Sequence, residues 1–353
     1  MIEILEAILP YIRGLWTLPW IVVGFFITIL LSRILGEEKI NKIMKKIGLI
    51  LLYFFVPFLL FRIFLSVDFG ENEIAFSSLC FVILALMYIL AYYYAKKLSN
   101  KFKSDDDKRH YIKTILTNQG RSSAFVGGAL LAIQEWWVLA AIYMSIGAIF
   151  LFAIIPYILS YLHKKDFINI DVKSNVKTLP WYLRLFPWYL LLFAFSAVIL
   201  HRFTGLVVND FGDFGIAFIF FTSLTIPAAL YYVGAGIHPR DLKINEMKKL
   251  FDFKLKKERI DHWFCVRNIF FLTVIITPIL TIIFTGFALI LDFIPKEWFA
   301  VLVINSILPI TSTNMFLVPY GIDKKITALS VTWTTLVCIP IVMILIVVFR
   351  LFL

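Results

Sequence analysis

A polar cluster with one arginine lies inside an apolar stretch that is long enough to cross a membrane. Residues 117–128 read TNQGRSSAFVGG and have apolar flanks at 111–116 and 129–133. A charge at the centre of a bilayer costs about 2.5–3.5 kcal/mol on insertion scales, so such residues are usually functional. Guanidinium groups bind carboxylates and phosphates through paired hydrogen bonds. Arg121 is therefore the first candidate for ligand chemistry in this chain.

A second segment, NSILPITSTNMFLVPYG at 305–321, combines polar side chains with a helix breaker in the same way. Pro309 has no N–H donor and disfavours helical geometry at the preceding residue, and Gly120 is the permissive residue in the first segment. The Ser and Thr residues after each break are helix-capping types, so free N–H groups are expected there. The two segments predict a substrate-binding site, with no catalytic residue and no cofactor, formed by Asn118, Gln119, Gly120, Arg121, Ser122, Ser123, Pro309, Thr311, Ser312, Thr313 and Asn314.

The composition places these segments in a membrane. Of the 353 residues, 61% are hydrophobic, whereas a soluble domain is about half apolar. The excess forms long apolar runs separated by charged ones, which is typical of a polytopic membrane protein and excludes a soluble enzyme. The sequence predicts ten spans, at 17–35, 47–66, 74–95, 111–133, 136–162, 181–203, 213–236, 266–291, 297–320 and 325–351.

Alternate connections between these spans hold 28 of the 34 Lys and Arg residues. Positive loops stay in the cytoplasm, so both termini are predicted to lie outside a cell membrane. The net charge of +11 is then a property of these loops rather than a sign of nucleic-acid binding. The longest, 238–267, is expected to be a solvated connection, with an anionic-lipid or regulatory contact as the alternative. In SDDDKRH at 104–110, Ser104 and the aspartates are expected to cap the fourth span.

The two halves of the predicted fold have similar features at corresponding positions. Five spans per half turn the second half upside down in the membrane, and prolines recur in corresponding spans, Pro57 with Pro227 and Pro156 with Pro340. Paired breaks in inverted repeats indicate a transporter binding site. We therefore predict an all-α fold of two inverted five-helix repeats in which helices 4 and 9 are broken. The repeats are residues 1–165 and 181–353, joined by a cytoplasmic linker at 166–180.

The charge of Arg121 has three compatible explanations. By the predicted spans, all 23 acidic residues lie at helix ends or in loops. Arg121 then hydrogen-bonds carbonyls at the helix break, faces a water-filled cavity, or binds a substrate anion. Without a titrating acid or His at that depth, uniport is favoured over proton coupling, although Asn118, Gln119, Asn305 and Asn314 are compatible with a sodium ion. The histidines and cysteines share no ligand spacing, so no metal site is expected.

Several stretches resemble one transporter family. GFFITILLSRILGEEKINKIMKKIGLILLYFFVPFLLFRIF, LTIPAALYYVGAGI and ILPITSTNMFLVPYGIDKKITALSVTWTTLVCIPIV look like the first two, the seventh and the last two spans of auxin efflux carriers. The resemblance implies the ten-span inverted-repeat fold with broken helices 4 and 9 crossing at mid-membrane, transport of organic anions, and roles for Asn118, Gly120, Pro309 and Asn314. Arg121 departs from the family pattern, which is closer to Asn-Thr-Gly-Phe, and suggests a smaller or more strongly anionic ligand than auxin.

Three functional hypotheses follow from these observations. The first is a secondary transporter that moves a small carboxylate by alternating access through the bilayer. The second is a sodium-coupled symporter of the related bile acid type, a fold in which homodimers are common. The third is a membrane sensor or intramembrane enzyme, which is disfavoured because no Ser/His, paired-acid or metal-ligand set lies at membrane depth.

Overall fold

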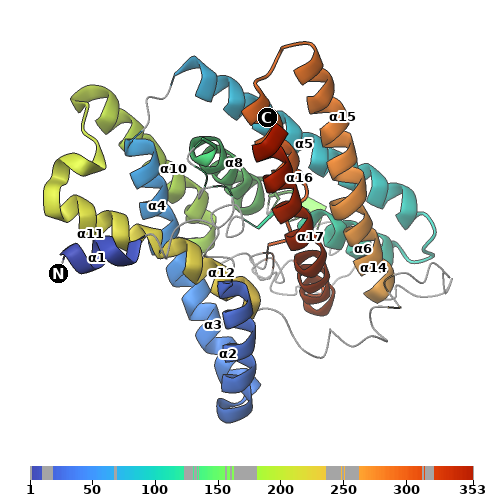
Figure 1. Ribbon diagram of the computed structural model, residues 1–353. Coiled ribbons are helices and arrows are strands. Elements are labelled where there is room, and N and C mark those ends of the chain that lie inside the picture. Colours follow the sequence, from blue (N-terminus) through green and yellow to red (C-terminus); the bar gives the residue numbers. More distant parts are fainter. Residues whose placement is uncertain are drawn as a thin grey trace. The chain divides into compact units, whose positions relative to one another are not determined.

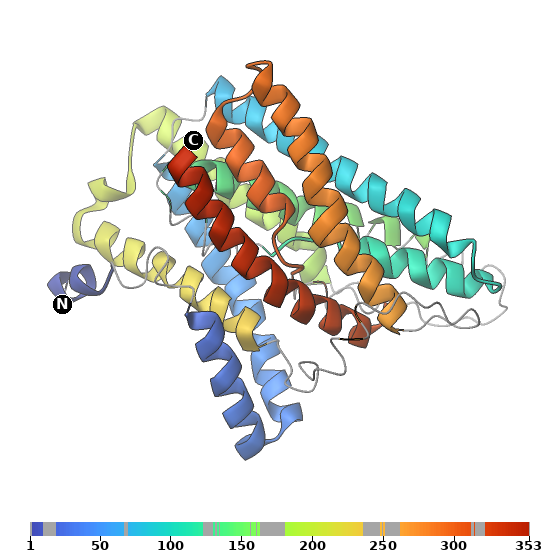
Figure 2. The same ribbon diagram turned by 45° about the vertical axis from the view of Figure 1, so that its right-hand side comes forward.

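The computed structural model describes most of the chain. The described residues are 2–9, 19–66, 70–122, 130, 133, 135–155, 157–159, 161–162, 181–235, 248, 250, 262–311, 314 and 322–352. Ser123, Ser312 and Thr313 of the predicted site lie outside them, as do the predicted linker at 166–180 and most of the basic loop 238–267. The described part is almost entirely helical and contains no β-strand (Figures 1 and 2).

Long apolar helices support a membrane-embedded protein. In the described part, four helices have the length and hydropathy to cross a bilayer, and a fifth candidate is a helix pair bent by 83° at residues 205–207. The four are Glu37–Leu65, Glu71–Ser99, His262–Ile290 and Lys325–Leu351. The protein is therefore an all-helical protein with several candidate membrane spans, while the ten spans and the inverted repeats stay predictions.

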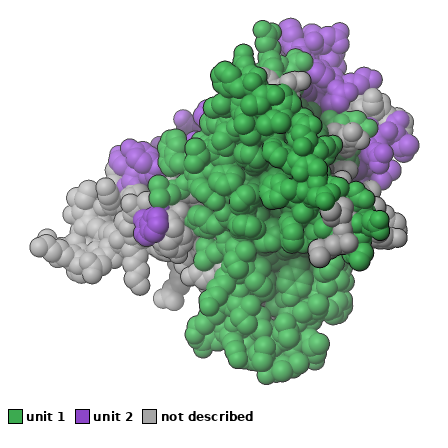
Figure 3. All heavy atoms as spheres, turned by 90° about the vertical axis from the view of Figure 1, so that its left-hand side faces the viewer, with its two compact units in different colours: residues 1–78, 123–145, 185–237 green, residues 79–122, 146–184, 238–353 purple. Residues whose placement is uncertain are grey.

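The chain folds into two compact units, each assembled from three separate segments (Figure 3). Unit 1 comprises Met1–Ser78, Ser123–Ser145 and Leu185–Ile237, and unit 2 comprises Leu79–Ser122, Ile146–Arg184 and His238–Leu353. Three described helices run from one unit into the other, α5 (Glu71–Ser99), α8 (Trp137–Ile149) and α10 (Trp181–Thr204). The remaining described helices of unit 1 are α1 (Ile2–Ile8), α2 (Trp20–Leu35), α3 (Glu37–Ile50), η3 (Leu51–Phe55), α4 (Val56–Leu65), η5 (Val208–Phe211), α11 (Gly212–Ser223) and α12 (Thr225–Ala235).

Unit 1 is built around a close crossing of α2 and α12. A Cβ atom at Gly24 would lie 2.1 Å from the backbone oxygen of Tyr231, and one at Gly234 would lie 1.9 Å from that of Ile21. Each glycine thus lies directly against the backbone of the other helix. Small residues allow such approaches in membranes, where packing rather than the hydrophobic effect drives helix association.

Arg62 joins two further helices of unit 1. Its Nη1 atom lies 2.9 Å from the carbonyl oxygen of Ile219 and 2.8 Å from both Thr222 Oγ1 and Ser223 Oγ. From the sequence, Arg62 belongs to the few basic residues at the outer ends of spans. In the structure it is a half-buried side chain in α4 that donates to the last turn of α11.

Three π-helical turns occur just before prolines. η3 ends two residues before Pro57, η4 (Phe150–Ile154) two residues before Pro156, and η7 (Leu272–Ile276) two residues before Pro278. A proline removes an N–H donor and its ring collides with a carbonyl of the preceding turn. A single wider turn accommodates that collision while the helix continues.

Unit 2 contains α6 (Asp105–Thr117) and α16 (Lys296–Ser306), which end where the sequence predicts the two helix breaks. It also contains α14 (His262–Phe271), η7, α15 (Thr277–Ile290) and α17 (Lys324–Phe352). α14 and α16 both pack on α17, and α15 packs on α16. α6 and α16 end beside the described binding residues, and α17 contacts the residues that follow both helix ends.

The start of α6 differs from the prediction in one respect. Ser104 occupies the N-cap position, but its side chain makes no capping hydrogen bond. Three aspartates do fill the first turn, as the helix dipole favours. Two of them pair with the next turn instead, Asp105 with Lys108 and Asp106 with Arg109, each at 2.7 Å. The hydrogen bond and charge of Lys108 lower the pKa of Asp105.

Candidate functional site

The first half of the site is the end of α6. Asn118 Nδ2 donates to the carbonyl of Thr114 at 2.8 Å, and Gln119 Nε2 donates to that of Ile115 at 3.1 Å. The last carbonyls of a helix lack backbone partners, and these two amide side chains help to satisfy them. The local sequence thus ends the helix and keeps two polar side chains at the break, both almost completely buried.

The second half of the site is the end of α16. The helix ends at Ser306, three residues before Pro309, which cannot donate to the helical ladder. Asn305 Nδ2 donates to the carbonyl of Val301 at 2.7 Å. Its amide is therefore folded back on its own helix, as those of Asn118 and Gln119 are.

A two-residue β-bridge between Arg121 and Ile310 joins the two breaks. Ser122 N–H donates to the Pro309 carbonyl at 2.8 Å, and Thr311 N–H donates to the Gly120 carbonyl at 2.9 Å. At each break, one backbone N–H group and one carbonyl are therefore hydrogen-bonded to the other break. Such pairing is the condition under which non-helical backbone is tolerated at membrane depth.

α17 fixes the bridge from one side. Thr334 Oγ1 accepts a hydrogen bond from the Ile310 N–H at 3.1 Å and itself donates to the Ser330 carbonyl at 2.6 Å. Two turns earlier on the same helix, Thr327 Oγ1 lies 3.4 Å from Asn118 Nδ2. Spacing of seven residues places both threonines on one helix face, so α17 contacts both breaks with that face.

Gly120 allows the closest approach between the breaks. A Cβ atom there would lie 2.9 Å from Asn314 Oδ1, 3.0 Å from Leu151 Cδ1 and 3.3 Å from Thr311 Cγ2. The absence of a side chain at Gly120 therefore leaves room for the Asn314 amide and for the bridge beside it.

Several buried side-chain oxygens of the site accept no hydrogen bond from any described residue. They include Asn118 Oδ1, Gln119 Oε1, Asn305 Oδ1 and Asn314 Oδ1. A buried acceptor left without a hydrogen bond costs roughly 1–3 kcal/mol. In a native site such groups point to a ligand, an ion or ordered water.

Arg121 is 8% exposed and lies in the bridge itself. Among the described residues, the buried charged side chains are Arg121 and Lys113, and no acidic residue of that part of the chain is buried. Both buried charges of the described residues are therefore positive.

Eight of the eleven predicted site residues are described, and all eight lie around this pair of breaks. The sequence prediction did not include the buried hydroxyl side chains of α17. Thr327, Ser330, Thr332, Thr334 and Thr335 are fully buried. The signal was present as the polar run TALSVTWTT in an otherwise apolar span.

The sequence matches no protein-family model and no curated protein. The resemblance to auxin efflux carriers therefore remains a prediction.

Proposed function

We propose that this chain is a secondary transporter that moves a small organic anion, a carboxylate, across the cell membrane by alternating access. The proposal includes ten spans in two inverted five-helix repeats, extracytoplasmic termini, and kinship with auxin efflux carriers. Candidate membrane helices support the location. Transport itself rests on the paired helix breaks.

One observation carries the choice of an anion. A buried arginine is held in a β-bridge between two helix interruptions, in a region where no described acidic residue is buried. Arginine in that setting binds a carboxylate with two parallel hydrogen bonds. Broken helices that meet at a polar site are the arrangement by which several transporter folds bind small charged substrates.

The experiment is uptake into proteoliposomes with a panel of radiolabelled mono- and dicarboxylates. Replacing Arg121 by alanine removes one partner of a buried charge pair, which costs about 2–5 kcal/mol, so kcat/KM for the accepted substrate is expected to fall roughly 30-fold or more. Arg350→Ala is the matched control, because Arg350 is an exposed arginine in the last turn of α17. Equal uptake by wild type and Arg121→Ala would refute the site, and no flux of any carboxylate would refute the substrate class.

Sodium-coupled transport is the second candidate, and the buried amide oxygens favour it. Hard cations prefer carbonyl and hydroxyl oxygens, and the four acceptors of Asn118, Gln119, Asn305 and Asn314 supply that chemistry. In the same vesicles, replacing external sodium by potassium abolishes uptake if this candidate holds. Unchanged uptake in potassium excludes it and leaves the uniport proposal intact.

A further inference from the structure

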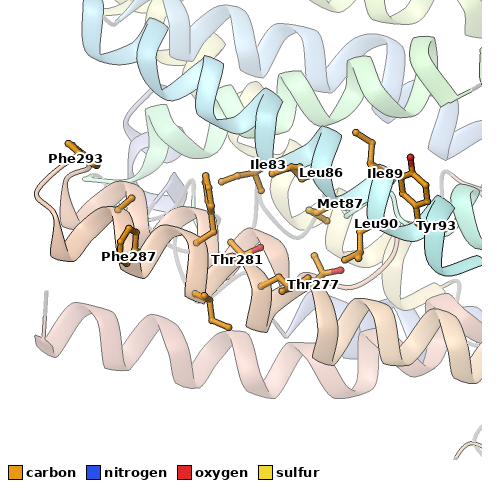
Figure 4. A pocket seen from close by; sticks show the side chains of 14 residues that line it. Ile83, Leu86, Met87, Ile89, Leu90, Tyr93, Thr277, Thr281, Phe287 and Phe293 are labelled. Atoms are coloured by element: carbon orange, nitrogen blue, oxygen red, sulfur yellow. The ribbon is translucent and has the colours of Figure 1, made fainter.

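An apolar groove of about 760 Å³ lies between α5 and α15 in unit 2. Side chains of both helices line it, and Phe293 closes one end. Figure 4 shows Phe287 and Phe293 at one end and Tyr93 at the other, with Ile83 and Thr281 between them. Both walls belong to candidate membrane spans, Glu71–Ser99 and His262–Ile290.

The lining runs along both helices, over two stretches that are offset from each other along the groove (Figure 4). Ile83 and Tyr93 are about 15 Å apart along the axis of α5, from the helical rise of about 1.5 Å per residue. Thr277 and Ala288 are similarly about 16.5 Å apart along α15. The hydrocarbon core of a bilayer is about 30 Å thick, so each lined stretch is about as long as one leaflet is thick. A single acyl chain therefore matches the lining of each wall in length and in chemistry.

A basic side chain, Lys97, lies beyond the end of the groove on the face of α5 that lines it. The lining residues Leu86, Leu90 and Tyr93 recur at steps of four and three, and Lys97 follows Tyr93 by four residues and Leu90 by seven. Lys97 is exposed and makes no ion pair with any described residue. The Lys96 ammonium lies over the ring of Tyr92, 5.9 Å from its centroid, and Tyr92 does not line the groove. Lys97 is thus about one turn beyond the apolar groove, at the depth expected for a lipid headgroup.

We infer that this groove binds one anionic phospholipid, with an acyl chain between α5 and α15 and the headgroup phosphate beside Lys97. The inference depends on α5 and α15 crossing a membrane and not on transport. Lipid tails are as apolar as the helix surface, so apolar area alone gives no preference for a bound lipid over the bulk bilayer. The shape of the groove retains the acyl chain, and the charge of Lys97 favours an anionic headgroup over a zwitterionic one.

The test is native mass spectrometry of the purified full chain in detergent, with dioleoyl-phosphatidylglycerol and dioleoyl-phosphatidylcholine as probes. Wild type is expected to retain one phosphatidylglycerol per chain in preference to phosphatidylcholine. One juxtamembrane lysine corresponds to a preference of about five-fold. Lys97→Gln is expected to bring that preference close to parity, whereas Lys96→Gln, with the same loss of charge, keeps most of it.

Filling the groove gives the second arm. Ala288 is a half-buried lining residue, so the indole of Ala288→Trp occupies space that the acyl chain needs, and loss of the retained lipid is expected. Ile282→Trp is the control, because Ile282 is an exposed residue of α15 outside the groove. Unchanged retention in Ala288→Trp would overturn the inference. Equal binding of the two lipids by wild type would overturn it too. So would a wild-type dimer that carries no lipid and dissociates in Ala288→Trp, because the groove would then bind a second copy of the chain.

Discussion

Replacing Gly24 by alanine is expected to destabilise the protein, although alanine is the better helix former. Intrinsic propensity favours alanine over glycine by about 1 kcal/mol in a helix interior. Against this, the new Cβ would lie 2.1 Å from the Tyr231 backbone oxygen, whereas ordinary contacts begin at 3.4 Å. The two helices must therefore separate by about 1.3 Å at the crossing.

The clash outweighs the propensity. Overpacking costs about 1–3 kcal/mol, and the upper part of that range applies because the obstacle is backbone and cannot change rotamer. The net change in the free energy of unfolding is then about 1–2 kcal/mol in the destabilising direction. Gly234→Ala meets the Ile21 backbone oxygen at 1.9 Å and should behave in the same way. The double variant should lose less than the sum, because one separation of the helices relieves both clashes.

The same substitution elsewhere supplies the control. At Gly286 in α15 the nearest atom to an added Cβ is Phe299 Cε2 at 3.7 Å, an ordinary contact. Gly286→Ala is therefore expected to stabilise the protein by up to about 1 kcal/mol. Unfolding by sodium dodecyl sulfate, followed by far-ultraviolet circular dichroism, measures both. If Gly24→Ala and Gly286→Ala shift the midpoint in the same direction, the close crossing of α2 and α12 is wrong.

Three further substitutions test the site and its supports. Gly120→Ala places a methyl group 2.9 Å from Asn314 Oδ1, so the Asn314 amide must move. Displacement of a binding group by well under 1 Å is enough to lower uptake, and we expect about a ten-fold loss in kcat/KM. The thermal unfolding midpoint is expected to stay close to that of wild type. Thr334→Val leaves the Ile310 N–H without its acceptor and should cost about 1–3 kcal/mol of stability, whereas Thr334→Ser should be nearly neutral; equal effects would disprove the hydrogen bond. Arg62→Leu removes the donor to the last turn of α11 and should destabilise the fold by about 2–4 kcal/mol, and an unchanged unfolding midpoint would contradict that packing role.

The helix interruptions were readable from the sequence because their causes are local. Gly120 and Pro309 act through their own backbones, and polar side chains stand beside each of them in the sequence. The pairing of Arg121 with Ile310 was not readable, since it depends on which residues of two distant segments meet. The role of Arg62 was hidden for the same reason, because the hydroxyls it contacts lie on another helix.

Helix ends were predicted less well than helix interiors. The spans were placed from apolar windows, but α5 continues to Ser99, beyond its predicted limit at residue 95, whereas the start of α6 at Asp105 follows the predicted cap at Ser104. A helix stops where its capping and backbone partners change, and charged turns remain helical in the headgroup region and in water. The π-helical turns were likewise missed, because a proline alone does not specify whether a helix kinks or widens.

The most direct test of the proposed role of Arg121 crosses a change in the protein with a change in the substrate. Uptake is measured for wild type and Arg121→Ala, each with the accepted carboxylate and with its neutral amide analogue, and kcat/KM gives four values. Direct pairing predicts a coupling free energy of about 2 kcal/mol or more, because Arg121→Ala loses the preference for the acid over the amide. If Arg121→Ala lowers uptake of both compounds by the same factor, the coupling is zero, and Arg121 supports the fold without binding the substrate.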